Sequence, residues 1–222
     1  MKISPTLTEV KKIAKTGKYD ILPVSCEILS DFITPIEAMR ILQNVSTHCY
    51  LLESAQANEA WGRYTFLGYD PKLEINCIDG HMKLGKLSVE TENPSEYIRQ
   101  ILSEYKSPKF DYLPSFTGGL VGYFSYDYLG YKEKSIRGKA RDTEDFKDVD
   151  LMLFDKVIAF DNLCQKIILI ANMSLDAPET GYNKAIVELK QLRELLMHGE
   201  KKKNMGGKLL GDVTPLFEKE QY

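Results

Sequence analysis

The sequence contains no hydrophobic run long enough to cross a lipid bilayer, since apolar stretches such as Leu151–Phe154 and Ile167–Ala171 span only four or five residues. Its formal net charge is −3, which argues against a broad basic surface for nucleic acid or an anionic membrane. The N-terminus also lacks the apolar segment of a secretory signal. We therefore expect a cytoplasmic protein that binds neither nucleic acid nor membranes.

Clustered cysteine and histidine residues are also missing. The three histidines are scattered, and the four cysteines lie far apart without a CxxC pair, so neither a disulfide framework nor a zinc site is indicated. We expect reduced, buried thiols and no metal or cofactor bound by this chain. The cysteines are Cys26, Cys49, Cys77 and Cys164.

The residues that are present have the balance of a globular protein, with 222 residues, 43% of them hydrophobic and 27% charged. One helix start is well marked, because Thr34 can cap, Pro35 suits the first helical position and Glu37 completes a capping box. Further helices are predicted by apolar residues at helical spacing. They cover residues 8–15, 94–105 and 180–197.

Alternating and continuous apolar segments predict a larger number of strands. Asp79-Gly80 is a favoured hairpin turn, and the strands around it, at 48–54, 64–69, 73–78 and 81–84, predict one antiparallel meander. Further strands are predicted at 19–27, 116–126, 151–160 and 166–172, the last two as a hairpin. Hairpins outnumber crossover units, so we expect an α+β fold, a mainly antiparallel sheet with helices packed outside.

The organisation along the chain predicts one domain over residues 1–198. Residues 199–213 are polar and contain glycine, and read as a linker. Residues 214–222 begin with Thr-Pro and read as the start of a helix, which would belong to a further domain. Residues 132–147 are charged and predict an excursion loop or a short polar helix.

Three motifs have a chemical interpretation and a structural one. Glu53 and Ser54 end an apolar strand, where a carboxylate and a hydroxyl suit an amino-acid ligand, but the residues alone favour a solvated turn. The glycines of residues 118–122 lack the lysine of a phosphate loop and favour close strand packing or a bulge. An acidic run holds Asp142, Glu144, Asp145, Asp148 and Asp150, and favours a solvated loop over a magnesium site.

Several segments together resemble the N-terminal region of anthranilate synthase component I. They are Leu51-Leu52-Glu53-Ser54, Trp61-Gly62-Arg63-Tyr64-Thr65-Phe66-Leu67-Gly68, the run from Phe116 to Asp127, the run from Asp150 to Asp161, and Thr34-Pro35. They occur in the family's order along nearly the whole chain. The resemblance implies that Glu53 and Ser54 belong to the tryptophan feedback site, with Leu52 as its apolar wall.

The resemblance also implies what the complete enzyme needs. The family converts chorismate to anthranilate and pyruvate in tryptophan biosynthesis, with ammonia from a glutamine amidotransferase subunit, component II. Its Mg²⁺ ligands and catalytic residues lie in the other half, so we expect no catalytic residue in this chain and no activity from it alone. Alternatives are the N-terminal half of aminodeoxychorismate synthase component I, and a non-catalytic tryptophan-binding or assembly module.

Overall fold

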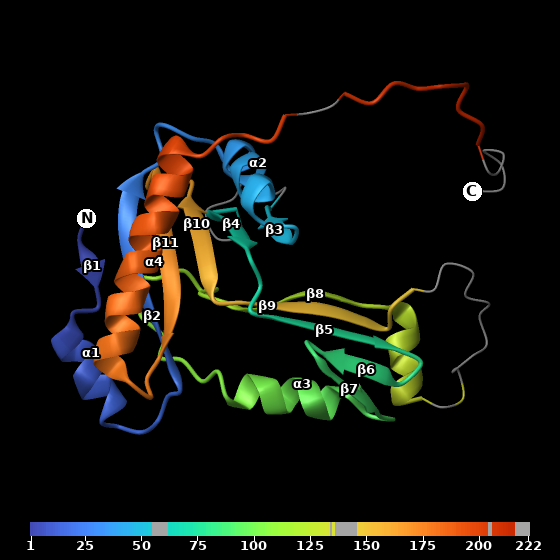
Figure 1. Cartoon of the computed structure of the whole chain (residues 1–222), viewed down its shortest axis with the longest axis horizontal. Coiled ribbons are helices and arrows are strands. Elements are labelled where there is room, and N and C mark those ends of the chain that lie inside the picture. The colour runs from blue at the N-terminus through green and yellow to red at the C-terminus, as the bar shows by residue number, and fades with distance from the viewer. Residues whose placement is uncertain (55–61, 134, 136–145, 204–205, 216–222) are drawn as a thin grey trace.

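The computed structural model describes residues 1–54, 62–133, 135, 146–203 and 206–215, and contains two antiparallel sheets (Figure 1). Six strands form the first sheet in the order β1-β2-β11-β10-β4-β3, and five form the second in the order β7-β6-β5-β9-β8. The strands are β1 Ile3–Ser4, β2 Ile21–Leu29, β3 Cys49–Leu52, β4 Tyr64–Tyr69, β5 Leu73–Ile78, β6 His81–Leu84, β7 Leu87–Glu90, β8 Gly119–Phe124, β9 Val149–Phe154, β10 Lys156–Asp161 and β11 Lys166–Ser174.

The helices lie outside these sheets, which confirms the predicted α+β fold. Helices α1, α2 and α4 pack on the six-stranded sheet, and their buried residues form one core with those of β2, β4, β10 and β11. Helix α3 and the 3₁₀ helix η1 contribute to a second core on the five-stranded sheet. The helices are α1 Leu7–Ala14, α2 Pro35–Val45, α3 Pro94–Ser103, η1 Tyr126–Tyr131 and α4 Pro178–His198.

The start of α2 follows from its local sequence, as predicted. Thr34 is the N-cap, its hydroxyl accepts from the Glu37 backbone N–H, and the Glu37 carboxylate accepts from the Thr34 N–H. Pro35 occupies the first helical position, where no N–H is needed. This helix positions the chain that leads into β3, with only three residues between the end of the helix and the start of the strand.

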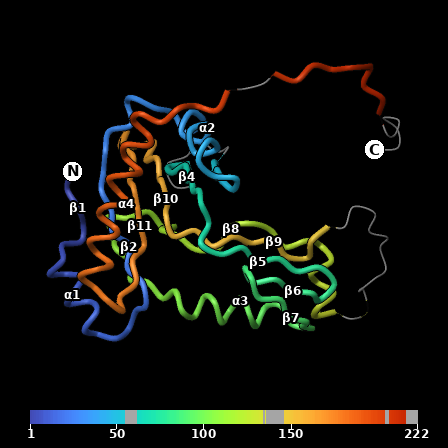
Figure 2. The backbone as a smooth tube through the Cα atoms, in the orientation of Figure 1, coloured from blue at the N-terminus to red at the C-terminus, as the bar shows by residue number. Residues whose placement is uncertain are grey.

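The predicted meander is wrong, because its strands belong to two sheets. Strands β3 and β4 pair in the six-stranded sheet, whereas β5 pairs with β6 and β9 in the other. The chain changes sheet after Asp70, which has a left-handed φ of 53°. Figure 2 shows β4 in the upright sheet leading into β5, which runs across the view. Alternation predicts strands but does not assign them to a sheet.

The predicted strand 151–160 is also two strands, interrupted at Asp155. Strand β9 lies in the five-stranded sheet and β10 in the six-stranded sheet. The Asp155 carbonyl accepts the backbone and side-chain N–H groups of Asn172, at 2.8 and 3.0 Å, so Asp155 stays hydrogen-bonded to the chain beside β10 where the backbone passes from one sheet to the other. The predicted hairpin with 166–172 is confirmed for β10 and β11.

The glycine-rich segment is a strand, β8, that lies very close to β9. A Cβ on Gly122 would lie 1.9 Å from the Asp150 carbonyl oxygen, and Gly122 has a φ of 152°. Only glycine fits this backbone without displacement. The structure therefore confirms close strand packing as the reason for this glycine.

The chain that follows α4 turns back along α2. The Lys202 carbonyl accepts from Arg40 Nε and Nη2, at 3.1 and 3.0 Å, and the Lys202 N–H donates to the Arg40 carbonyl at 2.9 Å. Asn44 Nδ2 donates to the Glu200 carbonyl at 3.0 Å. Residues 200–202 are thus fixed against α2. The helix predicted over 216–222 lies outside the described residues.

All four cysteines are free thiols. Cys26 and Cys77 are buried, and burial raises the pKa of Cys26 to about 11. Cys164 is exposed, and Cys49 is only partly buried, so the prediction of buried thiols is wrong for these two. Cys164 lies in the tight turn between β10 and β11, where a side chain reaches solvent.

Candidate functional site at the end of β3

The predicted ligand residues lie at the end of β3, an edge strand of the six-stranded sheet. Leu52 is the last residue of β3 and pairs with Phe66 of β4, and Glu53 and Ser54 follow directly. All three residues are exposed, Leu52 by 46%. The sequence therefore brings an apolar side chain, a carboxylate and a hydroxyl to one open strand end.

Aromatic side chains lie on the face of the sheet to which Leu52 points. Opposed residues of an antiparallel pair project to the same side, so Leu52 is beside Phe66. The Phe66 ring centroid lies 5.6 Å from that of Phe116 and 5.8 Å from that of Tyr64. These three rings are only partly buried, and they continue the apolar surface that Leu52 begins.

Tyr50 precedes Leu52 by two residues and points to the same face. Its ring contacts Phe154 edge-on at a centroid distance of 4.7 Å. It also lies across Gly68 of β4, where an added Cβ would be 2.2 Å from Tyr50 Cε1. Because Gly68 has no side chain, it leaves room for the Tyr50 ring against β4. Burial raises the pKa of the Tyr50 hydroxyl, which finds no hydrogen-bond partner among the described residues.

An ion pair fixes the start of β4 beside this strand end. Arg63 donates from Nε and Nη2 to the two carboxylate oxygens of Asp161, at 3.1 and 2.8 Å. The Asp161 side chain is fully buried, whereas that of Arg63 is 36% exposed. The Asp161 carboxylate also accepts the backbone N–H groups of Leu163 and Cys164, at 3.2 and 3.0 Å.

These contacts determine the charge of the pair. Burial alone would raise the pKa of Asp161, but the hydrogen bonds from Arg63 and from the Cys164 N–H outweigh it, so the pKa is lowered. The hydrogen bond to Asp161 raises the pKa of Arg63. Both groups are therefore charged at neutral pH. The Arg63 guanidinium also lies over the Tyr64 ring, 4.9 Å from its centroid.

Arg63 lies near the site, and no role for it was predicted from the sequence. Its partner Asp161 is 98 residues away and ends β10, the strand next to β4. Nothing in the local sequence links the two positions, and only the sheet order brings them together. Their pair holds the strand that faces the predicted ligand residues.

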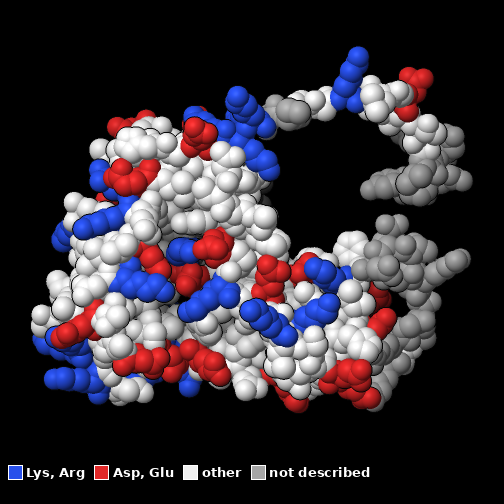
Figure 3. Space-filling model, viewed as in Figure 1, with Lys and Arg blue, Asp and Glu red and all other residues white. Residues whose placement is uncertain are grey.

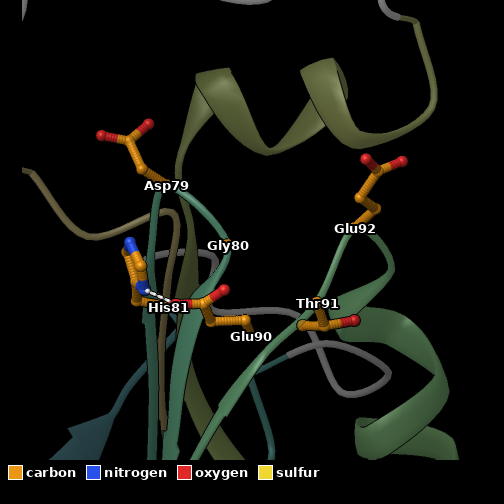
Figure 4. A pocket seen from close by; sticks show the side chains of 6 residues that line it. All are labelled: Asp79, Gly80, His81, Glu90, Thr91 and Glu92. Carbon is orange, nitrogen blue, oxygen red and sulfur yellow. Dashed lines mark ion pairs between the residues drawn. The ribbon is translucent and has the colours of Figure 1, made fainter.

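A different, acidic pocket lies at the β5–β6 turn and has a volume of about 370 Å³. Figure 4 shows His81 directed toward Glu90, 3.5 Å apart in an exposed pair, whereas the Asp79 and Glu92 carboxylates point away from each other. The lining residues are Asp79, Gly80, His81, Glu90, Thr91 and Glu92. Within the described part of the chain, no group of three or more His, Cys, Asp or Glu residues is placed to hold a metal ion.

The described members of the acidic run have structural partners. Asp148 accepts from the Tyr131 hydroxyl at 2.7 Å and from the Asp79 N–H at 2.9 Å, and Asp150 pairs with Lys147 at 2.8 Å. These contacts do not fit a Mg²⁺ site, which needs carboxylates free to coordinate the ion. Asp142, Glu144 and Asp145 lie outside the described residues.

On the face shown in Figure 3, acidic and basic side chains of the described residues are interspersed. None of the helices in the described ranges is both long and apolar enough to span a membrane.

Comparisons with known proteins identify similar chains. Anthranilate synthase component 1 of Acetivibrio thermocellus is 34% identical over 198 residues, which cover 86% of this chain and 39% of that protein. The component 1 of Pseudomonas aeruginosa is 35% identical over 196 residues, with 85% and 39% covered. The crystal structure of component I from Streptococcus pneumoniae TIGR4 matches with a TM-score of 0.49 and 25% identity, over 75% of this chain and 36% of that one.

The chain thus spans about two fifths of the length of these curated relatives. No protein-family model matches it. The predicted resemblance to the N-terminal region of anthranilate synthase component I is confirmed by the relatives' names and by this coverage.

Proposed function

We propose that this chain is the tryptophan-responsive N-terminal part of anthranilate synthase component I, and that Leu52, Glu53 and Ser54 form one side of its tryptophan site. The observation that carries the proposal is the exposed Leu52 beside partly buried aromatic rings, with a carboxylate and a hydroxyl directly after it. The similarity to proteins named anthranilate synthase component 1 supports the choice of ligand.

Each part of this strand end suits one part of tryptophan. The indole ring would lie against Leu52 and Phe66, because aromatic groups gain from burial against apolar and edge-on aromatic surfaces. The Glu53 carboxylate would pair with the α-ammonium group in a charge-assisted hydrogen bond. The Ser54 hydroxyl can both donate and accept, and would hydrogen-bond the polar end of the ligand. The open side of the strand end would need a second wall, which we assign to the rest of the complete enzyme.

Calorimetry with L-tryptophan tests this assignment. We expect no micromolar binding by the 222-residue chain, and binding once the chain is joined to the remaining part of the Pseudomonas aeruginosa relative. Ser54→Phe should abolish that binding, whereas Ser88→Phe, the same change on the distant strand β7, should not. Micromolar binding by the chain alone that is lost in Ser54→Phe would contradict the half-site, and would favour a self-sufficient tryptophan-binding module.

The activity of the complete enzyme would need groups beyond this chain. Conversion of chorismate to anthranilate and pyruvate calls for Mg²⁺ held by carboxylates and for an acid/base pair. The described carboxylates do not fit the metal, and we propose that the remaining part of the enzyme binds Mg²⁺ and carries the catalytic residues. Component II, the glutamine amidotransferase subunit, would supply ammonia.

We therefore propose that the chain alone does not make anthranilate. The measurement is anthranilate fluorescence after the purified chain is mixed with chorismate, ammonia and Mg²⁺. Sustained anthranilate formation that scales with the concentration of the chain would contradict the proposal. The same assay on the joined protein, with and without tryptophan, is the positive control and measures feedback inhibition.

A further inference from the structure

A hollow lies at the β1 edge of the six-stranded sheet, and we call it the α1 hollow. It has a volume of about 320 Å³ and is bounded by the end of β1, by α1 and by the segment between α3 and β8. Figure 1 shows β1 and α1 on the opposite side of this sheet from β3, which is its other outer strand. The hollow is therefore separate from the candidate tryptophan site. Residues that line it include Pro5, Glu9, Lys12, Ile13, Phe110 and Tyr112.

One face of α1 presents two opposite charges to this hollow. Glu9 and Lys12 are three residues apart and therefore lie side by side on the helix. The capping box fixes Glu9, because its Oε2 accepts from the Thr6 N–H and O–H groups, both at 2.7 Å. Among the described residues, Glu9 Oε1 has no hydrogen-bond partner and Lys12 forms no ion pair. The helix thus offers a fixed carboxylate and an ammonium group that are open to a ligand.

The charges of these two side chains select the kind of ligand. Hydrogen bonds from Thr6, and to a smaller extent the charge of Lys12, lower the pKa of Glu9, so its carboxylate is ionised at neutral pH. A ligand with only a carboxylate would be repelled by Glu9, and one with only an ammonium group would be repelled by Lys12. A zwitterion avoids both repulsions, because its ammonium group can bind Glu9 while its carboxylate binds Lys12. The two charges therefore favour a free amino acid.

The remaining wall of the α1 hollow is apolar and aromatic. The Tyr112 ring stacks on Phe110, with centroids 5.1 Å apart and an interplanar angle of 29°, yet Tyr112 stays 46% exposed. Pro5 and Ile13 complete this wall. An aromatic side chain gains more than an aliphatic one from lying against such an exposed ring. Pockets for small molecules begin at about 300 Å³, so a volume of about 320 Å³ suits one amino acid rather than a dinucleotide cofactor.

We propose that the α1 hollow binds a free amino acid with an aromatic side chain. The α-ammonium group donates to Glu9 Oε1, the α-carboxylate accepts from Lys12, and the side chain lies against Tyr112. Because the hollow is small and its charged groups are exposed, we expect a Kd of about 1 mM. Such binding is too weak to be mistaken for micromolar binding of tryptophan. The inference goes beyond the proposed function and does not depend on it.

A titration with L-phenylalanine, followed by the amide chemical shifts of the nitrogen-15-labelled 222-residue chain, tests this site. We expect saturable shifts confined to residues 4–13 and 110–112. Two analogues each lack one charge: 3-phenylpropionate has no ammonium group, and phenethylamine has no carboxylate. Each should bind about three- to tenfold more weakly than L-phenylalanine, because one charged hydrogen bond is lost and one repulsion remains. L-Alanine, which lacks the ring, should also bind more weakly.

Variants on α1 test the role of each charge. Lys12→Met should weaken binding of L-phenylalanine by about three- to tenfold, and should remove its advantage over phenethylamine. Lys15→Met, at the exposed C-cap of the same helix, is the matched control and should leave binding unchanged. Glu9→Gln keeps an oxygen that can accept from Thr6, and should remove the advantage of L-phenylalanine over 3-phenylpropionate. If circular dichroism shows that one variant does not fold, the other still tests the proposal.

Several results would overturn the inference. They are the absence of saturable shifts with excess L-phenylalanine, equal binding of 3-phenylpropionate and L-phenylalanine by the unchanged chain, and binding that is indifferent to Lys12→Met. Shifts that appear at residues 49–54 instead of the α1 hollow would also overturn it.

The outcomes separate this inference from the tryptophan site. Ser54→Phe should leave the L-phenylalanine titration unchanged, because Ser54 follows β3 at the other edge of the sheet. A joined protein that binds no tryptophan would refute the proposed function and leave the α1 hollow standing.

Discussion

The pair of Arg63 and Asp161 gives a quantitative prediction about the strand end that carries the candidate site. Arg63→Met removes the guanidinium and keeps much of the side chain's length. The buried Asp161 carboxylate then retains two backbone N–H donors but loses both of its charged donors. Removing one partner of a buried ion pair costs about 3–5 kcal/mol.

The exposure of Arg63 lowers that figure. Its side chain is 36% exposed, so water can replace part of the lost interaction. We therefore expect a loss of about 2–3 kcal/mol in the free energy of unfolding. For a chain of this size, 1 kcal/mol corresponds to a shift of about 2–4 °C in Tm, so Tm should fall by about 4–12 °C.

The assay is urea unfolding at pH 7, followed by circular dichroism, with Tm as a second measurement. Lys18→Met, a charge removal at an exposed position, is the control and should change stability by less than about 0.5 kcal/mol. A change in Arg63→Met as small as that of the control would refute the reasoning. In a double-mutant cycle, Arg63→Met should cost much less once Asp161 is already Asn, because no buried charge then remains unpaired.

Three further predictions concern separate features. Gly122→Ala should lower the free energy of unfolding in urea by about 2–4 kcal/mol, because the new methyl group would collide with the Asp150 carbonyl. Gly206→Ala is the control and should leave the free energy of unfolding unchanged, because a Cβ at Gly206 would have no atom within 4 Å. The pKa of Asp161 is lowered from its ordinary value of 3.8, so the ionised carboxylate stabilises the fold above that pH, and this contribution is lost as pH falls through the folded pKa. Asp161→Asn should therefore flatten the acid-induced loss of stability measured below about pH 4. An unchanged slope would contradict this. Arg40→Met should accelerate hydrogen exchange of the Lys202 amide while Gln43→Ala on the same helix does not, and equal rates would contradict the role of Arg40.

Much of the fold follows from local signals in the sequence. The capping residues around Thr34 and the Asp79-Gly80 turn act within a few residues, and the structure has both where they were predicted. The break at Asp155 was not predictable in this way, because β9 and β10 pair with different strands in two separate sheets. The split of the meander after Asp70 has the same origin, since sheet membership is decided by partners distant in sequence.

The candidate site was predictable only in part. The sequence identified the polar end of β3, and the resemblance gave its ligand, which stays a prediction. The aromatic surface beside Leu52 depends on the pairing of β3 with β4, and the Arg63–Asp161 pair depends on β10 lying next to β4. Such contacts between strands need the sheet order, which spacing along the chain does not provide.

The hydrogen bonds between α2 and the segment after α4 determine how short a self-sufficient version of this fold can be. A polypeptide ending at residue 198 would keep every helix and strand described above, yet Arg40 and Asn44 would lose the carbonyl groups that they hold. Lys201, which pairs with Glu37 in the first turn of α2, would be lost as well. The minimal stable unit therefore extends to residue 202, and any shortened or grafted version should keep residues 199–202.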